Sequence, residues 1–352
     1  MNQGEGKAGR ITCLLLAWYD ANKRSFPFRG PRDPYRVWLS EIMLQQTRTE
    51  TVGPYYERFL SLYPDVHALA GASEEEVLKA WEGLGYYSRA RNLLKAARIV
   101  SRELGGSFPD RAQDLQKLPG IGPYAAAAIA SIAYDEPIPA MDGNLNRVIS
   151  RLYLVEEEID SQQGKRMLYS LGQELMPERR AGDMNQALMD LGAGICLPGR
   201  PVCARCPLSE ECLAFAEGAA ARLPVLKQKK VSLIIPVAVV LIQCGGRILM
   251  FRRNEALLRG MYVFRLYEGD SGAQAALSAA RESAGKAELV SELGVSRHVF
   301  THRVWEMRLY HVRAETAGAV SGGVWADADE IRALPLPVAM KAAKKAALTL
   351  LD

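Results

Sequence analysis

Four cysteines crowded into seventeen residues constrain this chain more than any other feature. In the spacing C-x6-C-x2-C-x5-C, they are Cys196, Cys203, Cys206 and Cys212. Four thiolates so spaced can wrap one compact metal centre, and sulfur ligation suits either zinc or an iron–sulfur cluster. The alternative is a redox dithiol at Cys203 and Cys206, which the grouping of four disfavours. The spacing predicts a metal-pinned loop and leaves the choice between the two metals open.

Length and composition indicate a two-domain globular protein. The chain has 352 residues, 49% of them hydrophobic and 24% charged, and a net charge of +4 that permits an acidic partner. The apolar run 11–18 is short and lacks a cleavage site, and Pro236 interrupts the longer run 231–242. Spanning a bilayer needs ~20 apolar residues. We therefore expect a soluble, cytoplasmic protein of the bacterial cytosol, without a membrane partner.

The pattern of the chain changes after the cysteines. Residues 1–216 show apolar segments of helical period, among them 37–46, 90–104, 124–134 and 186–195. Residues 217–230 lack such a period and are interpreted as a linker. Two β-rich runs, 231–244 and 247–252, flank Gly245–Gly246 and predict a hairpin. We predict a mostly α region, a linker, and an α+β domain over 231–352.

A glycine-rich turn precedes a helix of small residues. The turn is Leu118–Tyr124, and Gly120 and Gly122 within it allow close backbone approach. The free N–H groups at the start of the following helix suit an anion such as a phosphate. An ordinary helix–turn–helix connection would look the same, so this turn gains weight only beside the cysteine loop.

Two carboxylates have surroundings suited to chemistry. The neighbours of Glu41 at helical spacing are mostly apolar, which would desolvate it, raise its pKa and equip it as a general acid. A glutamate at the edge of an amphipathic helix is the simpler alternative. Asp142 precedes a predicted helix over 145–154 and can cap it. Capping and a chemical role are compatible for Asp142.

Several of these motifs occur together in one known family. The turn Leu118–Tyr124 followed by the cysteine loop resembles the helix-hairpin-helix, iron–sulfur DNA glycosylases of the endonuclease III superfamily. The segments Leu39–Thr47, Gly83–Arg89 and Met141–Asn144 look like its adenine glycosylase (MutY) branch. The resemblance is close over about the first 215 residues and looser beyond.

The resemblance implies an activity and a set of roles. It implies a monomer that carries a [4Fe–4S] cluster on the four cysteines and binds double-stranded DNA. The substrate would be adenine opposite 8-oxoguanine or guanine. Glu41 would protonate the base, Asp142 would stabilise the deoxyribose cation, and Tyr124 and Asn144 would orient Asp142 and water. The other residues implied to contact the base or the DNA are Arg29, Gln46, Thr47, Leu84, Tyr86, Gly120, Gly122, Gln186 and Arg200. Phe28 stands where the family has a tryptophan.

The resemblance also bears on strand cleavage and on the C-terminal domain. Bifunctional relatives carry a lysine where this chain has Tyr124, so we expect base removal without efficient strand cleavage. Residues 231–352 resemble a Nudix-like domain that reads 8-oxoguanine through a Phe-Ser-His loop. That loop is Phe300, Thr301 and His302 here, and the segment Gly260–Phe264 also departs from the family pattern. The segment 281–286 holds one glutamate, too few for a magnesium-binding Nudix box.

Three alternatives remain at this stage. A glycosylase for damaged pyrimidines is disfavoured by Tyr124 and by the extra C-terminal domain. A non-catalytic DNA-binding or iron–sulfur sensor module is disfavoured by the presence of both Glu41 and Asp142. A nucleotide hydrolase is disfavoured because the metal-binding carboxylates are missing.

Overall fold

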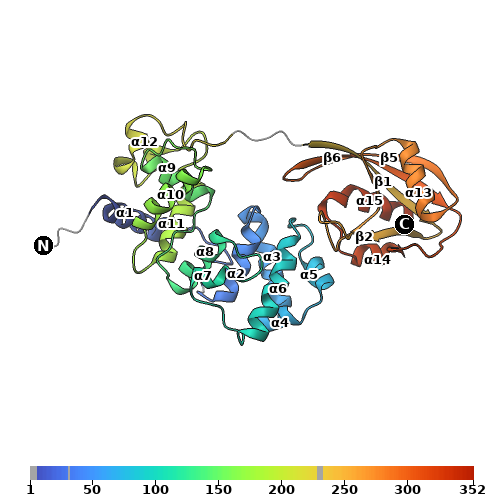
Figure 1. The fold of residues 1–352 in the computed structure, drawn as a ribbon, viewed down its shortest axis with the longest axis horizontal. Helices are drawn as coiled ribbons and strands as arrows, with labels where there is room; N and C mark the ends of the chain where they lie inside the picture. Colours follow the sequence, from blue (N-terminus) through green and yellow to red (C-terminus); the bar gives the residue numbers. More distant parts are fainter. Residues whose placement is uncertain (1–5, 31, 228–232) are drawn as a thin grey trace. The chain divides into compact units, whose positions relative to one another are not determined.

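The computed structural model describes residues 6–30, 32–227 and 233–352 (Figure 1). The chain divides into two compact units, Met1–Gly71 with Asn92–Lys229 and Ala72–Arg91 with Lys230–Asp352. The domain limits predicted at 216 and 230 stay predictions, and residues 228–232 of the linker and first strand lie outside the described ranges. Within those ranges, none of the helices combines the length and apolarity needed to cross a bilayer.

The first unit is helical, as the sequence predicted. Its elements are α1 (Lys7–Asn22), α2 (Pro34–Leu44), α3 (Thr49–Leu62), α4 (Val66–Gly71), most of α6 (Ser88–Glu103), α7 (Ala112–Leu115), α8 (Pro123–Tyr134), α9 (Gly143–Leu152), α10 (Gln162–Glu174), α11 (Ala181–Gly194), η1 (Cys203–Arg205), η2 (Ser209–Glu211) and α12 (Leu213–Ala216). The five predicted helices correspond to α2, α6, α8, α9 and α11. Their ends differ: α2 stops at Leu44, two residues early, so Gln46 lies in the turn that follows.

Two packing arrangements place the site in this unit. Apolar residues of α1, α9, α10 and α11 form one buried cluster, in which α11 contributes Met184, Leu188 and Leu191. Seven of the twelve residues of helix α8 are alanine or serine, and Ala125–Ala130 are buried between α2 and α11. Small side chains let helix axes approach closely. Helix α8 therefore brings side chains of α2 and α11 toward a common region.

The second unit contains a mixed sheet of seven strands within the described residues. Its elements are α5 (Glu74–Ala80), β1 (Leu233–Cys244), β2 (Arg247–Arg252), β3 (Tyr262–Val263), β4 (Arg265–Glu268), α13 (Ala273–Ala284), β5 (Ala287–Val299), β6 (Arg303–Ala314), β7 (Gly323–Ala326), α14 (Ala328–Ala333), η3 (Val338–Met340) and α15 (Lys341–Leu351). The order is β3-β2-β1-β6-β5, with β4 on β1 and β7 on β2. Only β1 and β6 pair in parallel among these strands.

Alternation along β1 explains how helices cover both faces of this sheet (Figure 1). Val237, Val239 and Leu241 pack in a cluster with residues of α14 and α15. The intervening residues 238, 240 and 242 pack with alanines of α13 on the other face. Successive strand residues point to opposite faces, so a fully apolar strand needs cover on both. The predicted hairpin is confirmed, with Cys244 opposite Arg247, and so is the α+β class.

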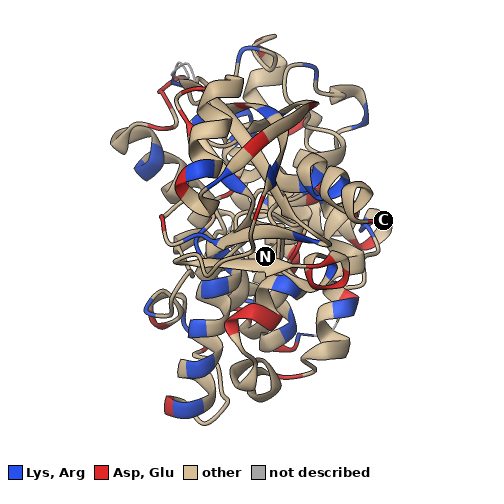
Figure 2. Cartoon of the chain, turned by 90° about the vertical axis from the view of Figure 1, so that its right-hand side faces the viewer, with Lys and Arg blue, Asp and Glu red and all other residues tan. Residues whose placement is uncertain are grey.

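Charge is mixed along the chain. Figure 2 shows lysine and arginine interspersed with aspartate and glutamate on the ribbons. This agrees with the modest net charge of +4. Charge alone therefore does not mark a binding face, and the site has to be found from individual contacts.

Candidate active site

Glu41 is a buried carboxylate on α2, with 6% of the residue exposed. Its Oε2 accepts a 2.9 Å hydrogen bond from the Tyr124 hydroxyl on α8. Burial raises the pKa of Glu41 to about 7; the bond from Tyr124 opposes that rise, the charge of Asp142 adds to it, and that of Arg29 opposes it. The desolvation expected from its helical neighbours is confirmed. A carboxyl with this pKa can hold a proton near neutral pH and release it.

A cavity of about 340 Å³ opens beside Glu41 in the first unit. Its wall includes Glu41, Tyr124, Phe28, Arg29 and Gln186. The structure thus brings together four residues singled out from the sequence, together with Phe28, which stands where the family has a tryptophan. A concave pocket with a few convergent polar groups is the usual form of a small-ligand site.

Asp142 is the N-cap of α9, as its position before a predicted helix suggested. Its Oδ1 accepts a 2.7 Å bond from the Leu145 N–H, and its Oδ2 accepts a 2.8 Å bond from Asn144 Nδ2. Burial raises the pKa of Asp142, and these bonds oppose the rise. Asn144 thus contacts Asp142, whereas the hydroxyl of Tyr124 contacts Glu41. Asp142 is not among the residues that line the cavity, and its influence on Glu41 is electrostatic.

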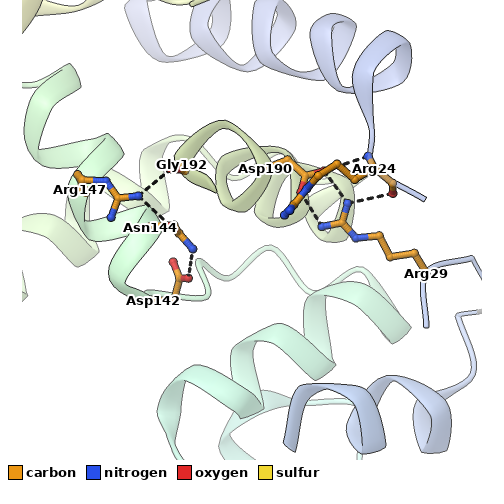
Figure 3. Close-up of polar contacts among 7 residues, drawn as sticks. All are labelled: Arg24, Arg29, Asp142, Asn144, Arg147, Asp190 and Gly192. Atoms are coloured by element: carbon orange, nitrogen blue, oxygen red, sulfur yellow. Dashed lines mark hydrogen bonds and ion pairs between the residues drawn. The ribbon is translucent and has the colours of Figure 1, made fainter. Parts of the chain in front are cut away.

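Arg147 connects Asn144 to the cysteine loop, a link that was not predicted from the sequence; Figure 3 shows its bonds to Asn144 and Gly192. Its Nη2 donates 2.8 Å bonds to Asn144 Oδ1 and to the carbonyl of Gly192, and its Nε donates a 2.7 Å bond to the carbonyl of Cys196. Arg147 precedes Arg151 by one helical turn on α9. Two arginines at that spacing are the signal that could have suggested a shared polar face.

The four cysteines line a cavity of about 30 Å³ together with Arg151. Arg151 is 2% exposed, its Nη1 lies 3.2 Å from Cys196 Sγ, and its Nη2 has no hydrogen-bond partner among the described residues. A buried cation beside four thiols suits a site in which they are thiolates bound to a metal. Among the described residues, no three Cys, His, Asp or Glu side chains are arranged to hold a single metal ion.

Asp190 on α11 joins two arginines beside the Glu41 cavity (Figure 3). Its carboxylate accepts bonds of 2.5 and 3.0 Å from Arg29 and one of 2.7 Å from Arg24 Nε. The Asp190 side chain is 2% exposed. Asp190 and Arg24 were not predicted from the sequence, although an acidic residue between Met189 and Leu191 in a helix indicates a buried partner.

Comparison with known proteins agrees with this architecture. Residues 39–174 match the model of the HhH-GPD superfamily base excision DNA repair proteins, and residues 237–346 match that of the NUDIX domain. A solved structure of a thermostable thymine-DNA glycosylase is 30% identical, with a TM-score of 0.56 over 60% of this chain and 97% of that one. The chain belongs to the HhH-GPD superfamily of base excision DNA repair proteins.

Several relatives carry the name adenine DNA glycosylase, among them proteins from mouse and from Arabidopsis thaliana. The mouse protein is 46% identical over 210 residues, which are 57% of this chain and 41% of the relative. The Arabidopsis thaliana protein is 38% identical over 301 residues, 74% of this chain and 48% of the relative. This chain thus spans less than half the length of either relative.

The hairpin of the HhH-GPD region has the backbone that its glycines predict. Gly120 has φ +81°, and a Cβ there would lie 2.6 Å from Asn92 Cβ, so glycine is required. Gly122 is the N-cap of α8, which has no side-chain cap. Arg200 in the cysteine loop and Gln46 after α2 are exposed, and Thr47 is half-buried. These residues are accessible to a large polar ligand.

In the second unit, the predicted recognition residues from two distant segments lie together. Thr301 Oγ1 is 3.4 Å from the hydroxyl of Tyr86, which is 45% exposed with φ +48°. Tyr86 is therefore a surface residue, whereas Leu84 is buried. Phe300 packs edge-on against Trp305, and His302 is exposed. All of these except Trp305 line a cavity of about 480 Å³ within that unit.

Proposed function

We propose that this chain is an adenine DNA glycosylase that hydrolyses the N-glycosidic bond of adenine opposite 8-oxoguanine or guanine in double-stranded DNA. The observation that carries the proposal is the buried Glu41, with a pKa of about 7, in the wall of a cavity. The names of the relatives are a second, independent support. Adenine inside a duplex is inaccessible, so the base must be flipped into the cavity.

The two carboxylates have environments suited to different tasks. Glycosidic cleavage needs a proton for the leaving base and a negative charge near the developing sugar cation. Glu41 receives one hydrogen bond from Tyr124 and is buried, so it supplies the proton. Asp142 receives bonds from Leu145 N–H and Asn144, which favour its ionised form, so it stabilises the cation. Burial raises the pKa of Tyr124 well above its usual value, and its hydroxyl keeps its proton as a donor.

Residues of the first unit, some exposed and some in the cavity wall, would hold the DNA and the flipped base. The hairpin at Gly120 and Gly122 presents the N-terminus of α8 to a phosphate. Gln46 and Thr47 would contact the distorted duplex beside the flipped base, and Arg29 and Gln186 would contact the adenine in the cavity. Arg200 would meet the backbone from the cysteine loop.

The second unit would recognise the opposing base. Tyr86 offers an exposed ring for stacking, and Thr301 and His302 offer hydrogen-bonding groups next to Phe300. Leu84, which is buried, would pack beneath the exposed side chains of this surface. A Nudix hydrolase activity is disfavoured, because Glu282 is paired with Arg265 at 3.2 Å and no second glutamate follows within 283–286.

Cys196, Cys203, Cys206 and Cys212 would hold a [4Fe–4S] cluster, with Arg151 as a buried cation beside it. Bound there, the cluster would pin the loop 196–212 in one conformation. We further propose that the protein removes the base without efficient strand cleavage, since Tyr124 offers no amine for a Schiff base. It would act as a monomer in the cytoplasm.

The test is single-turnover cleavage of a labelled duplex with one 8-oxoguanine:A pair, worked up with and without alkali. Alkali-dependent breakage at the adenine alone is expected, with none in a T:A duplex. The Glu41→Gln protein should bind the duplex without cleaving it. Tight binding by an inactive wild-type protein would instead point to a non-catalytic DNA-binding role.

A further inference from the structure

Asp190 is a buried anion that does not line the Glu41 cavity but holds a residue that does. Both its oxygens take part: Oδ2 accepts from Arg29 Nη1, and Oδ1 accepts from Arg29 Nη2 and Arg24 Nε. A bidentate guanidinium–carboxylate pair fixes orientation as well as distance. Arg29 thus has one position relative to α11.

The same two arginines also pack on one aromatic ring. The guanidinium of Arg24 lies 4.9 Å and that of Arg29 lies 5.3 Å from the centre of Phe26. Phe26 in turn stacks on Phe28, a residue of the cavity wall, at 5.2 Å. The carboxylate and the ring together hold residues 24–29 as one rigid loop before any ligand enters.

We propose that Asp190 is a positioning residue that fixes Arg29 in the cavity wall and offsets its charge, so that Glu41 keeps a transferable proton at neutral pH. The inference rests on the proposed function, because it concerns the proton that the departing base receives. Asp190 acts only through Arg29 and does not touch the substrate. Two guanidiniums and one carboxylate leave an excess positive charge beside the cavity. The closer this charge lies to Glu41, the more it lowers the pKa of that carboxyl.

The surroundings of Glu41 leave Arg29 as the main opposing cation. Charged or titratable groups around the cavity, element by element, are Tyr19 on α1; Lys23, Arg24, Arg29 and Arg32 in the following loop; Tyr124 on α8; Asp142 at the start of α9; and Asp183 and Asp190 on α11. Among them, Arg29 is the cation whose charge lowers the pKa of Glu41. Releasing Arg29 from Asp190 should therefore weaken the hold of Glu41 on its proton.

The experiment compares Asp190→Asn with the wild type in two measurements. The first is the pH dependence of single-turnover adenine release, where the rate falls as Glu41 loses its proton. The second is a pH titration of the free protein labelled with ¹³C at the glutamate carboxyls, in which the Glu41 signal is assigned by its loss in Glu41→Gln. Both midpoints should move to lower pH by on the order of one unit. Unchanged midpoints in a folded protein would overturn the inference.

Two further variants separate this effect from general disruption. Glu156→Gln removes the same charge from an exposed pair with Arg222 and should leave both midpoints in place. Arg29→Met should move the Glu41 midpoint to higher pH, and adding Asp190→Asn to it should change nothing more. If Asp190→Asn does not fold, Arg29→Met alone decides, and an unmoved midpoint refutes the inference. If the wild type releases no adenine, the proposed function fails, while the titration still decides the role of Asp190.

Discussion

The Tyr124 hydroxyl donates a 2.9 Å hydrogen bond to Oε2 of Glu41 across the interface between α8 and α2. Burial raises the pKa of Glu41, and this bond opposes that rise. Tyr124→Phe should therefore move the alkaline midpoint of the rate profile to higher pH, by on the order of one unit. Tyr134→Phe is the matched control, since that hydroxyl on α8 bonds the carbonyl of Phe108 instead. A midpoint that moves equally in both variants would contradict the assignment.

The raised pKa of Glu41 also predicts a pH-dependent stability. A carboxyl whose pKa is 4.5 when unfolded and about 7 when folded stabilises the fold fully below pH 4.5 and loses that contribution as pH rises through 7. Glu41→Gln cannot ionise, so its free energy of unfolding should exceed that of the wild type by about 3 kcal/mol at pH 8 and match it near pH 4. Urea unfolding at several pH values measures this difference. A difference in free energy of unfolding that does not change with pH would show that the pKa of Glu41 is not raised in the folded protein.

Gly192 on α11 leaves room for Asn144. A Cβ at position 192 would lie 2.6 Å from Asn144 Cβ and 3.1 Å from its Oδ1. Gly192→Ala should displace Asn144 from Asp142 and slow adenine release by roughly 10- to 100-fold. Gly194→Ala on the same helix meets nothing within 4 Å and should be neutral. Single-turnover rates of the two variants decide; equal rates would show that the space is unnecessary.

Gly120 and Gly122 in the hairpin should differ sharply in tolerance. Gly120→Ala combines φ +81° with a 2.6 Å approach to Asn92, so it should lower the free energy of unfolding by roughly 2–4 kcal/mol. Gly122→Ala has φ −83° and open space, so it should cost less than about 1 kcal/mol. Urea unfolding of both variants measures the two losses in free energy of unfolding. Equal losses would show that the hairpin backbone can move to accept a side chain at position 120.

The loop at Thr301 and His302 should carry preference for the base opposite adenine. Replacing both with alanine removes two hydrogen-bonding side chains, so the ratio of 8-oxoguanine:A to G:A cleavage should fall about tenfold. Thr316→Ala, at an exposed position in another loop, is the control. Rates on the two duplexes give the ratio. An unaltered ratio would show that this loop does not recognise the base opposite adenine.

Local features of the site could be predicted from sequence, and long-range ones could not. The burial of Glu41 follows from apolar neighbours one turn away, and the capping by Asp142 follows from its place before a helix. Both depend on spacing within a few residues. The bond from Tyr124 to Glu41 joins residues 83 apart, and the pair of Arg29 with Asp190 joins residues 161 apart. Such pairings depend on how helices pack, which periodicity within one helix does not encode.

Helix α11 carries Asp190, which holds the arginines, and Gly192, whose carbonyl holds Arg147 (Figure 3). The Asp190 side chain and the Gly192 carbonyl lie two residues apart on one stiff stretch of helix. One short stretch of α11 therefore fixes Arg29 beside the Glu41 cavity and, through Arg147, Asn144 next to Asp142. A substitution that displaces this stretch of α11 is therefore expected to disturb both sets of contacts at once.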